Sequence, residues 1–225
     1  MRPVASSRLV PLLALVLLAA LVLSCSSQPE QQVLESFVNA VQAGDEAAAA
    51  QVSLVEFPGD VSTWELVEVG PESSEPFALA KLQEERAAMV KELEEMIANN
   101  DQFLRDNEEL YYQYKPKKDK DPETKFTGKL KEFDEAFSAR MDEQTALDKK
   151  IREAGNGIDA LKKAAALSTN TPGLGASYDG DVLQKQATVK FDGKSYKVTL
   201  KQYALINTEH NMRPVSRWII TDISE

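Results

Sequence analysis

The stretch ATVKFDGKSYKVTLKQY, residues 187–203, decides what kind of fold this chain can form. Apolar and polar residues alternate on both sides of Asp192-Gly193, a dipeptide that favours the tight turn of a β-hairpin. Residues 215–223 (VSRWIITDI) have the composition of a further strand, and residues 61–69 (VSTWELVEV) have it too. The pattern therefore predicts a curved antiparallel sheet of about four strands.

Two short helices are expected before the first of these strands. Residues 34–41 place apolar side chains three and four positions apart, which is the spacing of one helix face. Gly44 is typical of a helix C-terminus, and Asp45 is typical of the N-cap of a second helix over residues 45–54. Because these two helices would pack on an antiparallel sheet, the predicted fold class is α+β.

Residues 78–168 differ in composition from the rest of the chain and follow a polar linker at residues 70–76 (GPESSEP). Their apolar residues recur with heptad spacing in two runs, which predicts two long helices. The Lys-rich stretch KPKKDKD at residues 115–121 interrupts the pattern, and Pro122 suits the first turn of the second helix. We therefore expect a long antiparallel helical hairpin, inserted after the first strand, with this stretch as its tip.

The middle of the hairpin is expected to contain a polar layer. Folding the chain about Lys118 places Arg140 near Met96 and Asn100, and Arg140 and Gln144 both occupy seam positions. A polar residue in an apolar seam fixes the register of the paired helices. Residues 155–157 (GNG) lie further along the second helix, where glycine lowers the helix propensity, so we expect a kink or fraying there.

One apolar stripe of the first long helix would be left over after the two helices pair. Such a stripe is a candidate surface for contact with another protein. The alternative is that it packs the hairpin against the domain or widens the seam. Its members are Val90, Ile97, Leu104 and Tyr111.

Residues 1–24 have the anatomy of a secretory signal peptide, with a positive start and an uncharged apolar run. The ending at Cys25 resembles the lipobox of bacterial lipoproteins, whose cysteine carries fatty acids that anchor the protein in a membrane. Residues 25–32 would then be the lipidated cysteine and a short tether. Ser26 resembles the residue that directs such proteins to the outer membrane in bacteria with two membranes. We therefore expect a location in the bacterial cell envelope, on the periplasmic side of the outer membrane in such bacteria.

The charge balance argues against some classes of partner. The chain has 36 acidic and 26 basic residues and a formal net charge of −10, so it has no bulk attraction for nucleic acid. Cys25 is its single cysteine, which excludes a disulfide within the chain. We find no metal-ligand spacing and no nucleotide-binding loop, and we expect no cofactor.

Two segments together resemble the nuclear transport factor two-like domains. Residues 37–53 (FVNAVQAGDEAAAAQVS) are similar to the first helices of this family, in which a helix ends at a Gly-Asp step. Residues 187–203 and residues 216–223 (SRWIITDI) look like the antiparallel strands that close its cone-shaped fold.

The resemblance implies a cone-like domain made of residues 33–77 and 169–225, and residues 78–168 depart from the family as an insertion. The superfamily includes ketosteroid isomerase-like enzymes and many proteins that bind ligands or partners. No catalytic residue is carried over to this sequence by a motif.

Three hypotheses for function follow. The first is a non-enzymatic envelope lipoprotein that uses the helical hairpin to contact a partner protein. The second is binding of a small apolar ligand in a pocket between the first helix and the sheet, lined by Phe37, Val41, Trp64, Val198 and Trp218. The third, an isomerase- or hydrolase-like enzyme, has the least support, because Asp192, Tyr203 and His210 fit turn, sheet and loop roles better than catalysis.

Overall fold

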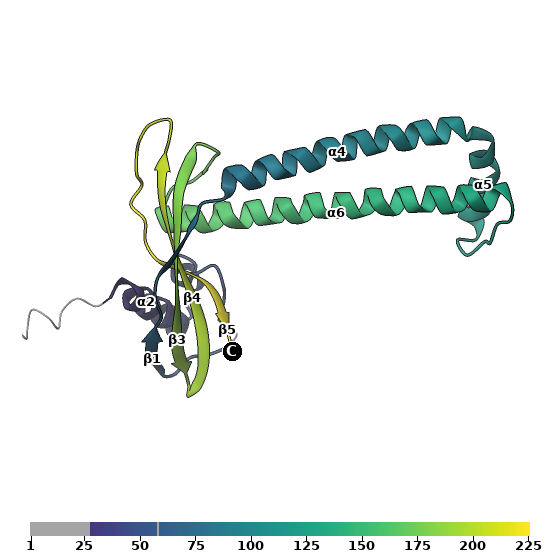
Figure 1. The fold of residues 1–225 in the computed structure, drawn as a ribbon. Helices are drawn as coiled ribbons and strands as arrows, with labels where there is room; N and C mark the ends of the chain where they lie inside the picture. Colours follow the sequence, from purple (N-terminus) through teal and green to yellow (C-terminus); the bar gives the residue numbers. More distant parts are fainter. Residues whose placement is uncertain (1–27, 58) are drawn as a thin grey trace, which may run out of the picture.

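The computed structural model describes residues 28–57 and 59–225 of the chain. In this part the chain forms an α+β domain and a long helical arm that projects from it (Figure 1). The predicted α+β class is confirmed. The helices are α2 (Pro29–Ala43), α3 (Glu46–Ala49), α4 (Leu79–Asp106), α5 (Glu108–Lys120) and α6 (Lys129–Thr169). The strands are β1 (Trp64–Val69), β2 (Ser73–Pro76), β3 (Tyr178–Phe191), β4 (Lys194–Asn207) and β5 (Ile219–Ser224).

The sheet is antiparallel throughout, with the order β1-β3-β4-β5. Strands β3 and β4 form the predicted hairpin, and they pair from Phe191 opposite Lys194 to Tyr178 opposite Asn207. Asp192 and Gly193 make the turn with φ angles of 48° and 82°, the left-handed conformations that a two-residue hairpin turn requires. The sequence therefore predicted this central hairpin correctly.

The sheet has five described strands, not the four or so expected, because part of the expected linker is a strand. Ser73–Pro76 forms β2 and pairs with residues 181–184 of β3, beyond the end of β1. All four residues of β2 are exposed, so its composition carries no sign of a strand. β3 is 14 residues long and β1 only six, which leaves a free edge of β3 for β2 to pair with.

One apolar core lies between α2 and the sheet. Leu34, Phe37 and Val38 project from α2 and are at most 1 % exposed, as the predicted helical stripe requires. Helix α2 begins at Pro29, so the last four residues of the expected tether are helical. Proline suits the first turn of a helix, and Glu30 is drawn into the domain by an ion pair with Lys185.

Helix α3 is shorter than the segment 45–54 that was expected to form it. Asp45 caps it as predicted, because its carboxylate accepts the Ala48 N–H at 2.9 Å. The chain then leaves the helix after Ala49 to pair with β5: Leu54 N–H donates to the Ile220 carbonyl, and Ile220 N–H donates to the Val52 carbonyl. Backbone pairing with the sheet ends the helix early.

A second apolar core joins the helical arm to the other end of the sheet. It contains residues from the start of α4 and the last turns of α6, such as Leu79 and Ala165, together with Tyr203 and Ile219. The Ser168 hydroxyl, 1 % exposed, donates to the Arg217 carbonyl at 2.6 Å and accepts the Tyr203 N–H at 3.1 Å. The base of the arm is therefore fixed to the domain by both packing and hydrogen bonds.

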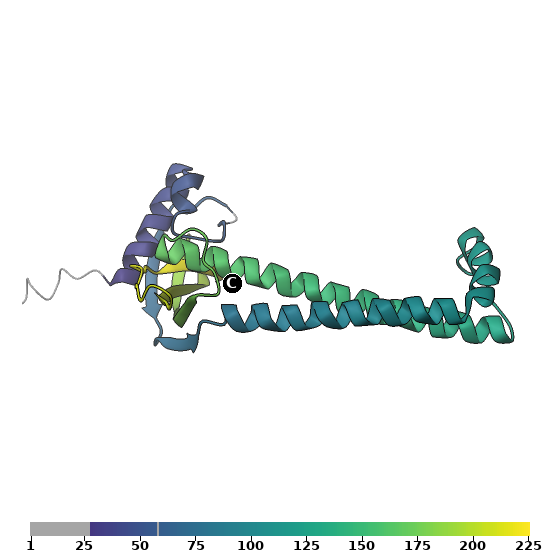
Figure 2. The same ribbon diagram turned by 90° about the horizontal axis from the view of Figure 1, so that it is seen from above.

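The helical arm, residues 79–169, consists of α4, α5 and α6. Helices α4 and α6 lie side by side in both views, and α5 turns away at the far end (Figures 1 and 2). The boundaries differ from those expected. The first helix divides at Asn107, the Lys-rich stretch lies largely within α5 instead of forming a loop, and α6 begins at Lys129 instead of near Pro122.

Helix α6 runs unbroken for 41 residues, so the expected kink or fraying at residues 155–157 is not present. Gly155 lies against α4, where a Cβ atom would stand 3.4 Å from Arg86 Nε. The packing of the arm therefore holds this stretch helical despite its low helix propensity.

Candidate functional sites

A polar layer crosses the middle of the helical arm. Asn100 is 4 % exposed, and its amide nitrogen donates to the Gln144 side-chain oxygen at 2.9 Å. Arg140 donates to the Asn100 side-chain oxygen at 3.4 Å, and its guanidinium lies 4.5 Å from the centre of the Phe103 ring. The predicted polar layer is confirmed, with Asn100 as its buried member.

The far end of the helical arm is held together by aromatic rings. Phe103 of α4 and Phe133 of α6 stack with their centroids 5.5 Å apart, and Tyr114 of α5 packs edge-on against Phe133 at 5.4 Å. Burial, and then the negative charge of Asp134, raise the pKa of Tyr114. The same cluster includes Tyr111, Phe126 and Phe137. The sequence analysis did not predict that these rings gather and hold α5 in place.

The predicted partner stripe is exposed at only one of its four positions. Ile97 is 40 % exposed, whereas Val90 and Leu104 are half-buried. Tyr111 packs against Phe137 at 6.1 Å, because the chain turns into α5 before it. Tyr112, the next residue, is 67 % exposed. The structure therefore leaves Ile97 and Tyr112 as the large exposed apolar side chains of the arm, whereas the other three residues of the stripe are half-buried.

The five residues predicted to line an apolar pocket do not enclose one together. Phe37, Val198 and Trp218 are at most 5 % exposed and belong to the core between α2 and the sheet. Val41 and Trp64 pack against that same core. Their side chains fill the space that the prediction left open for a ligand.

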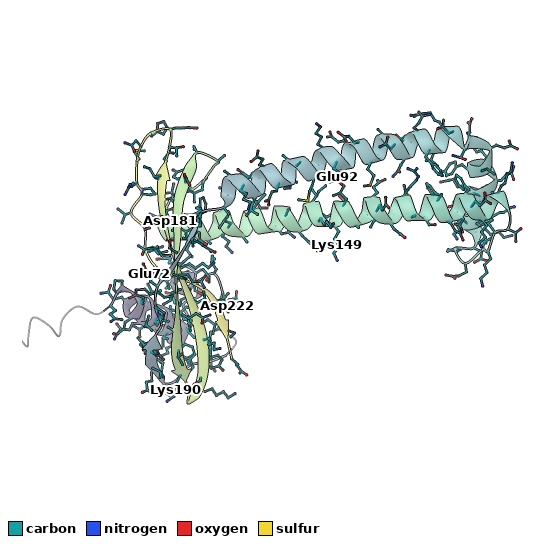
Figure 3. The ribbon with its side chains drawn as sticks, in the orientation of Figure 1. Glu72, Glu92, Lys149, Asp181, Lys190 and Asp222 are labelled. Carbon is teal, nitrogen blue, oxygen red and sulfur yellow. The ribbon has the colours of Figure 1, made fainter. Side chains whose placement is uncertain are left out.

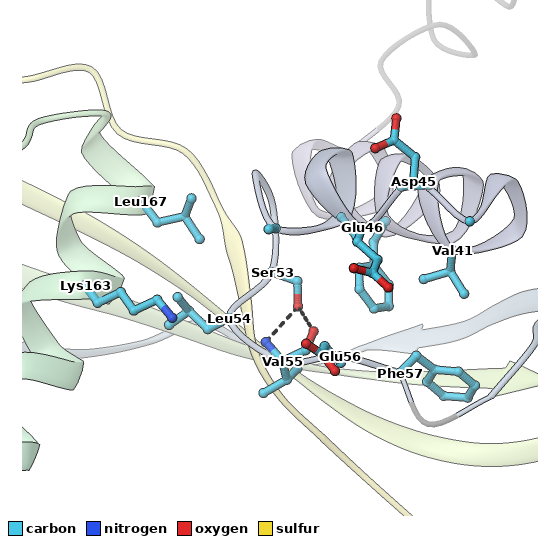
Figure 4. Close-up of a pocket in the computed structure, with 15 residues that line it drawn as sticks. Val41, Asp45, Glu46, Ser53, Leu54, Val55, Glu56, Phe57, Lys163 and Leu167 are labelled. Carbon is cyan, nitrogen blue, oxygen red and sulfur yellow. Dashed lines mark hydrogen bonds between the residues drawn. The ribbon is translucent and has the colours of Figure 1, made fainter.

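A pocket does lie nearby, at the C-terminal end of α2, and Phe37 and Val41 are part of its wall. Its volume is about 570 Å³, and we call it the α3 pocket (Figure 4). It is bounded by α2, by α3, by residues 53–57 and by the last turns of α6. The sequence prediction included two of its lining residues, Phe37 and Val41. It missed the others, because residues more than 100 positions apart form the walls and no local pattern joins them.

The walls of the α3 pocket are joined by hydrogen bonds from Arg217. Its guanidinium donates to the Gln51 carbonyl at 2.8 Å and to the Leu167 carbonyl at 3.3 Å. These bonds connect the segment after α3 to the C-terminal part of α6. The pocket is therefore part of the ordered junction between domain and arm.

A buried ion pair fastens the start of α2 to the sheet. Lys185 of β3 donates to Glu30, which is 4 % exposed, at 2.5 Å, and its ammonium group lies 3.5 Å from Glu72 and 5.1 Å from the centre of the Trp218 ring. Figure 3 shows Glu72 where α2 meets the sheet. The hydrogen bond to Glu30 is the main cause that raises the pKa of Lys185. The ion pair has a structural role, because it joins the first turn of α2 to β3.

The weak catalytic candidates occupy structural positions. Asp192 is exposed in the hairpin turn, where its carboxylate accepts the Thr63 N–H at 2.7 Å and the Ser62 N–H at 3.1 Å; these bonds lower its pKa. Tyr203 is 3 % exposed, and burial raises its pKa to about 12. His210 is exposed beyond the end of β4.

In residues 28–57 and 59–225, no group of three or more histidine, cysteine, aspartate or glutamate side chains is placed to hold a metal ion. Within the same ranges, no helix combines the length and apolar character that crossing a membrane needs. Cys25, the predicted lipidation site, lies outside the described part of the chain.

Comparison with known proteins found no matching family model, no similar curated protein and no similar solved structure.

Proposed function

We propose that this protein is a non-enzymatic lipoprotein of the bacterial cell envelope that binds a partner protein through its helical arm. In this proposal residues 1–24 are a signal peptide, and fatty acids on Cys25 hold the protein at a membrane. The α+β domain is a nuclear transport factor two-like cone, and the arm is a helical hairpin inserted into it.

The observation that carries the proposal is the projection of the arm from the domain. At 1.5 Å per residue, a helix as long as α6 is about 60 Å long. Only the base of the arm packs on the sheet, through the second core, and the rest stands away from the domain (Figure 1). An arm of this length adds little to the core of the domain, so contact with something else is the role that accounts for it.

The construction of the arm also favours a rigid contact element. The Asn100 layer fixes how α4 and α6 are aligned, and the aromatic cluster fixes α5 at the far end. Most of its outer surface is charged, with i,i+4 pairs such as Lys131–Glu135 at 3.6 Å and Lys149–Glu153 at 3.8 Å. Figure 3 shows Glu92 and Lys149 out along the arm. Ile97 and Tyr112 are the large apolar side chains that remain open on this polar surface.

Photocrosslinking in cells tests the partner contact. A photoreactive amino acid replaces Ile97 or Tyr112 in the arm and, as a matched control, Val67 in β1, which is 49 % exposed. We expect the two arm positions to crosslink to the same envelope protein and the control position not to. Equal products from all three positions, or none from the arm, would contradict the proposal.

Fatty-acid labelling tests the anchor. The wild-type chain should incorporate labelled palmitate and fractionate with membranes, and Cys25→Ser should do neither. Ser27→Ala is the control and should behave as the wild type. Equal labelling of the two variants would refute lipidation at Cys25.

A further inference from the structure

We propose that the α3 pocket binds a small amphiphile with an aliphatic body and a protonated amine. The inference is independent of the arm's partner and adds a ligand site to the domain. The pocket volume of about 570 Å³ lies within the range of about 300–1,000 Å³ that small-molecule sites occupy.

The inner wall of the pocket is apolar. Phe37 and Val41 from α2 lie on one side, and Leu54 and Val55 lie on another. Leu167 of α6 completes this wall, on the far side of the pocket from α2 (Figure 4). An aliphatic chain in this position would remove apolar surface from water on several sides at once.

The charged groups of the pocket favour a cation. Three carboxylates and one lysine line it, namely Asp45, Glu46, Glu56 and Lys163. The Asp45 carboxylate is already occupied as the cap of α3, and Figure 4 shows it pointing away from the pocket. Glu46 and Glu56 remain, against Lys163, so the balance of the available charge is negative. A ligand amine would be attracted to this side of the opening.

The Ser53 hydroxyl, which is the buried polar group in the pocket wall, already has hydrogen-bond partners within the chain. The Ser53 hydroxyl, in a residue 5 % exposed, donates to the Val55 carbonyl at 2.7 Å and accepts the Val55 N–H at 3.1 Å (Figure 4). Its hydrogen bonds are made within the chain. Selection among ligands therefore depends on the apolar wall and on the charge of Glu46 and Glu56.

Titration calorimetry of the full chain with octylamine and with octanol tests the proposal. The two probes share the aliphatic chain and differ in charge. Because exposed carboxylates are partly screened, we expect octylamine to bind about fivefold more tightly than octanol at low salt. The difference should largely disappear in 1 M NaCl. Equal affinity for both probes at low salt, or no binding of either, would overturn the proposal.

Two pairs of variants locate the site. Ala50→Trp places an indole in the pocket wall, and Ala47→Trp adds the same group to α3 outside that wall; both alanines are exposed. The affinity for octylamine should fall at least tenfold in A50W and should not change in A47W.

The second pair tests the charge. E46Q/E56Q should bind octylamine and octanol equally, whereas E92Q/E94Q, with the same change in net charge on α4, should keep the preference for octylamine. E46Q/E56Q alters no buried residue, so it decides the matter even if A50W does not fold. Equal effects within either pair would refute binding in the α3 pocket.

Discussion

The Asn100 amide nitrogen donates to the Gln144 side-chain oxygen at 2.9 Å across the helical arm, inside a seam that is otherwise mainly apolar. Substituting Asn100→Ala removes this bond and the acceptor of Arg140. We expect the free energy of unfolding to fall by about 1–3 kcal/mol, because Gln144 and Arg140 lose a partner in a partly buried place. Urea unfolding followed by circular dichroism measures the loss.

A double-mutant cycle measures the interaction energy between Asn100 and Gln144 apart from their other contacts. Gln144→Ala alone should also destabilise the arm, and N100A/Q144A should be less destabilised than the sum of the two single variants, by about 1 kcal/mol. Purely additive effects would mean that the bond contributes nothing to stability.

Glycine at position 157 weakens α6 without any packing reason. A Cβ atom there would meet no atom within 4 Å, and the φ angle is that of an ordinary helical residue. Gly157→Ala should therefore raise the free energy of unfolding by about 1 kcal/mol. For a chain of this size we expect the midpoint of thermal unfolding to rise by about 2–4 °C.

Gly180→Ala is the contrasting control for this prediction. Gly180 lies in β3 with φ at +135°, and a Cβ atom there would lie 2.2 Å from the Ala204 carbonyl oxygen. G180A should lower the midpoint markedly or prevent folding. A lower midpoint for G157A would show that residues 155–157 need glycine for a reason that the fold does not reveal.

The features that the sequence predicted correctly depend on local patterns. The β3–β4 hairpin follows from alternation around Asp192-Gly193, and the α2 stripe follows from helical spacing. Arg140 could be placed near Asn100 because paired helices put residues at similar distances from the turn close together. In each case the spacing along the chain fixes the position in space.

The features that were missed depend on contacts between distant segments. Ser73–Pro76 is a strand only because a long β3 offers it an edge, and α5 is held by packing between Tyr114 and Phe133. The α3 pocket arises where residues 53–57 meet the end of α6, more than 100 positions later. No sequence pattern within one segment could predict these long-range contacts.

The ion pair of Glu30 and Lys185 gives a third prediction. Lys185→Met leaves the Glu30 carboxylate enclosed without its main partner, so the free energy of unfolding should fall by about 3 kcal/mol. Replacing both residues, as E30M/K185M, should recover most of this loss, because an apolar pair suits a buried position. Urea unfolding of the three chains measures both effects.

Lys190→Met is the matched control for Lys185→Met. Lys190 also lies on β3 and pairs with Glu65 at 3.5 Å, but both side chains are largely exposed. K190M should change the free energy of unfolding by less than about 1 kcal/mol. If E30M/K185M proved as unstable as K185M, the loss would come from packing of the lysine chain and not from an unpaired charge.

The buried Tyr203 gives a prediction about alkaline solutions. Burial, with a smaller contribution from the charge of Glu75, raises its pKa from 10.0 to about 12. The folded chain therefore holds the phenol proton more tightly than the unfolded chain does. The resulting stability is fully present below pH 10 and is lost as the pH rises to about 12. Over this window the wild type should lose about 2–3 kcal/mol through Tyr203.

Lys185 and Tyr114 also have raised pKa values and act in the same direction, so the test compares variants. Tyr203→Phe should show a flatter loss of stability between pH 10 and 12 than the wild type, because its phenyl ring cannot ionise. Tyr112→Phe removes a tyrosine that is 67 % exposed and should follow the wild type. Urea unfolding at a series of pH values gives the three curves. Parallel curves for Y203F and the wild type would show that the Tyr203 proton is not coupled to folding.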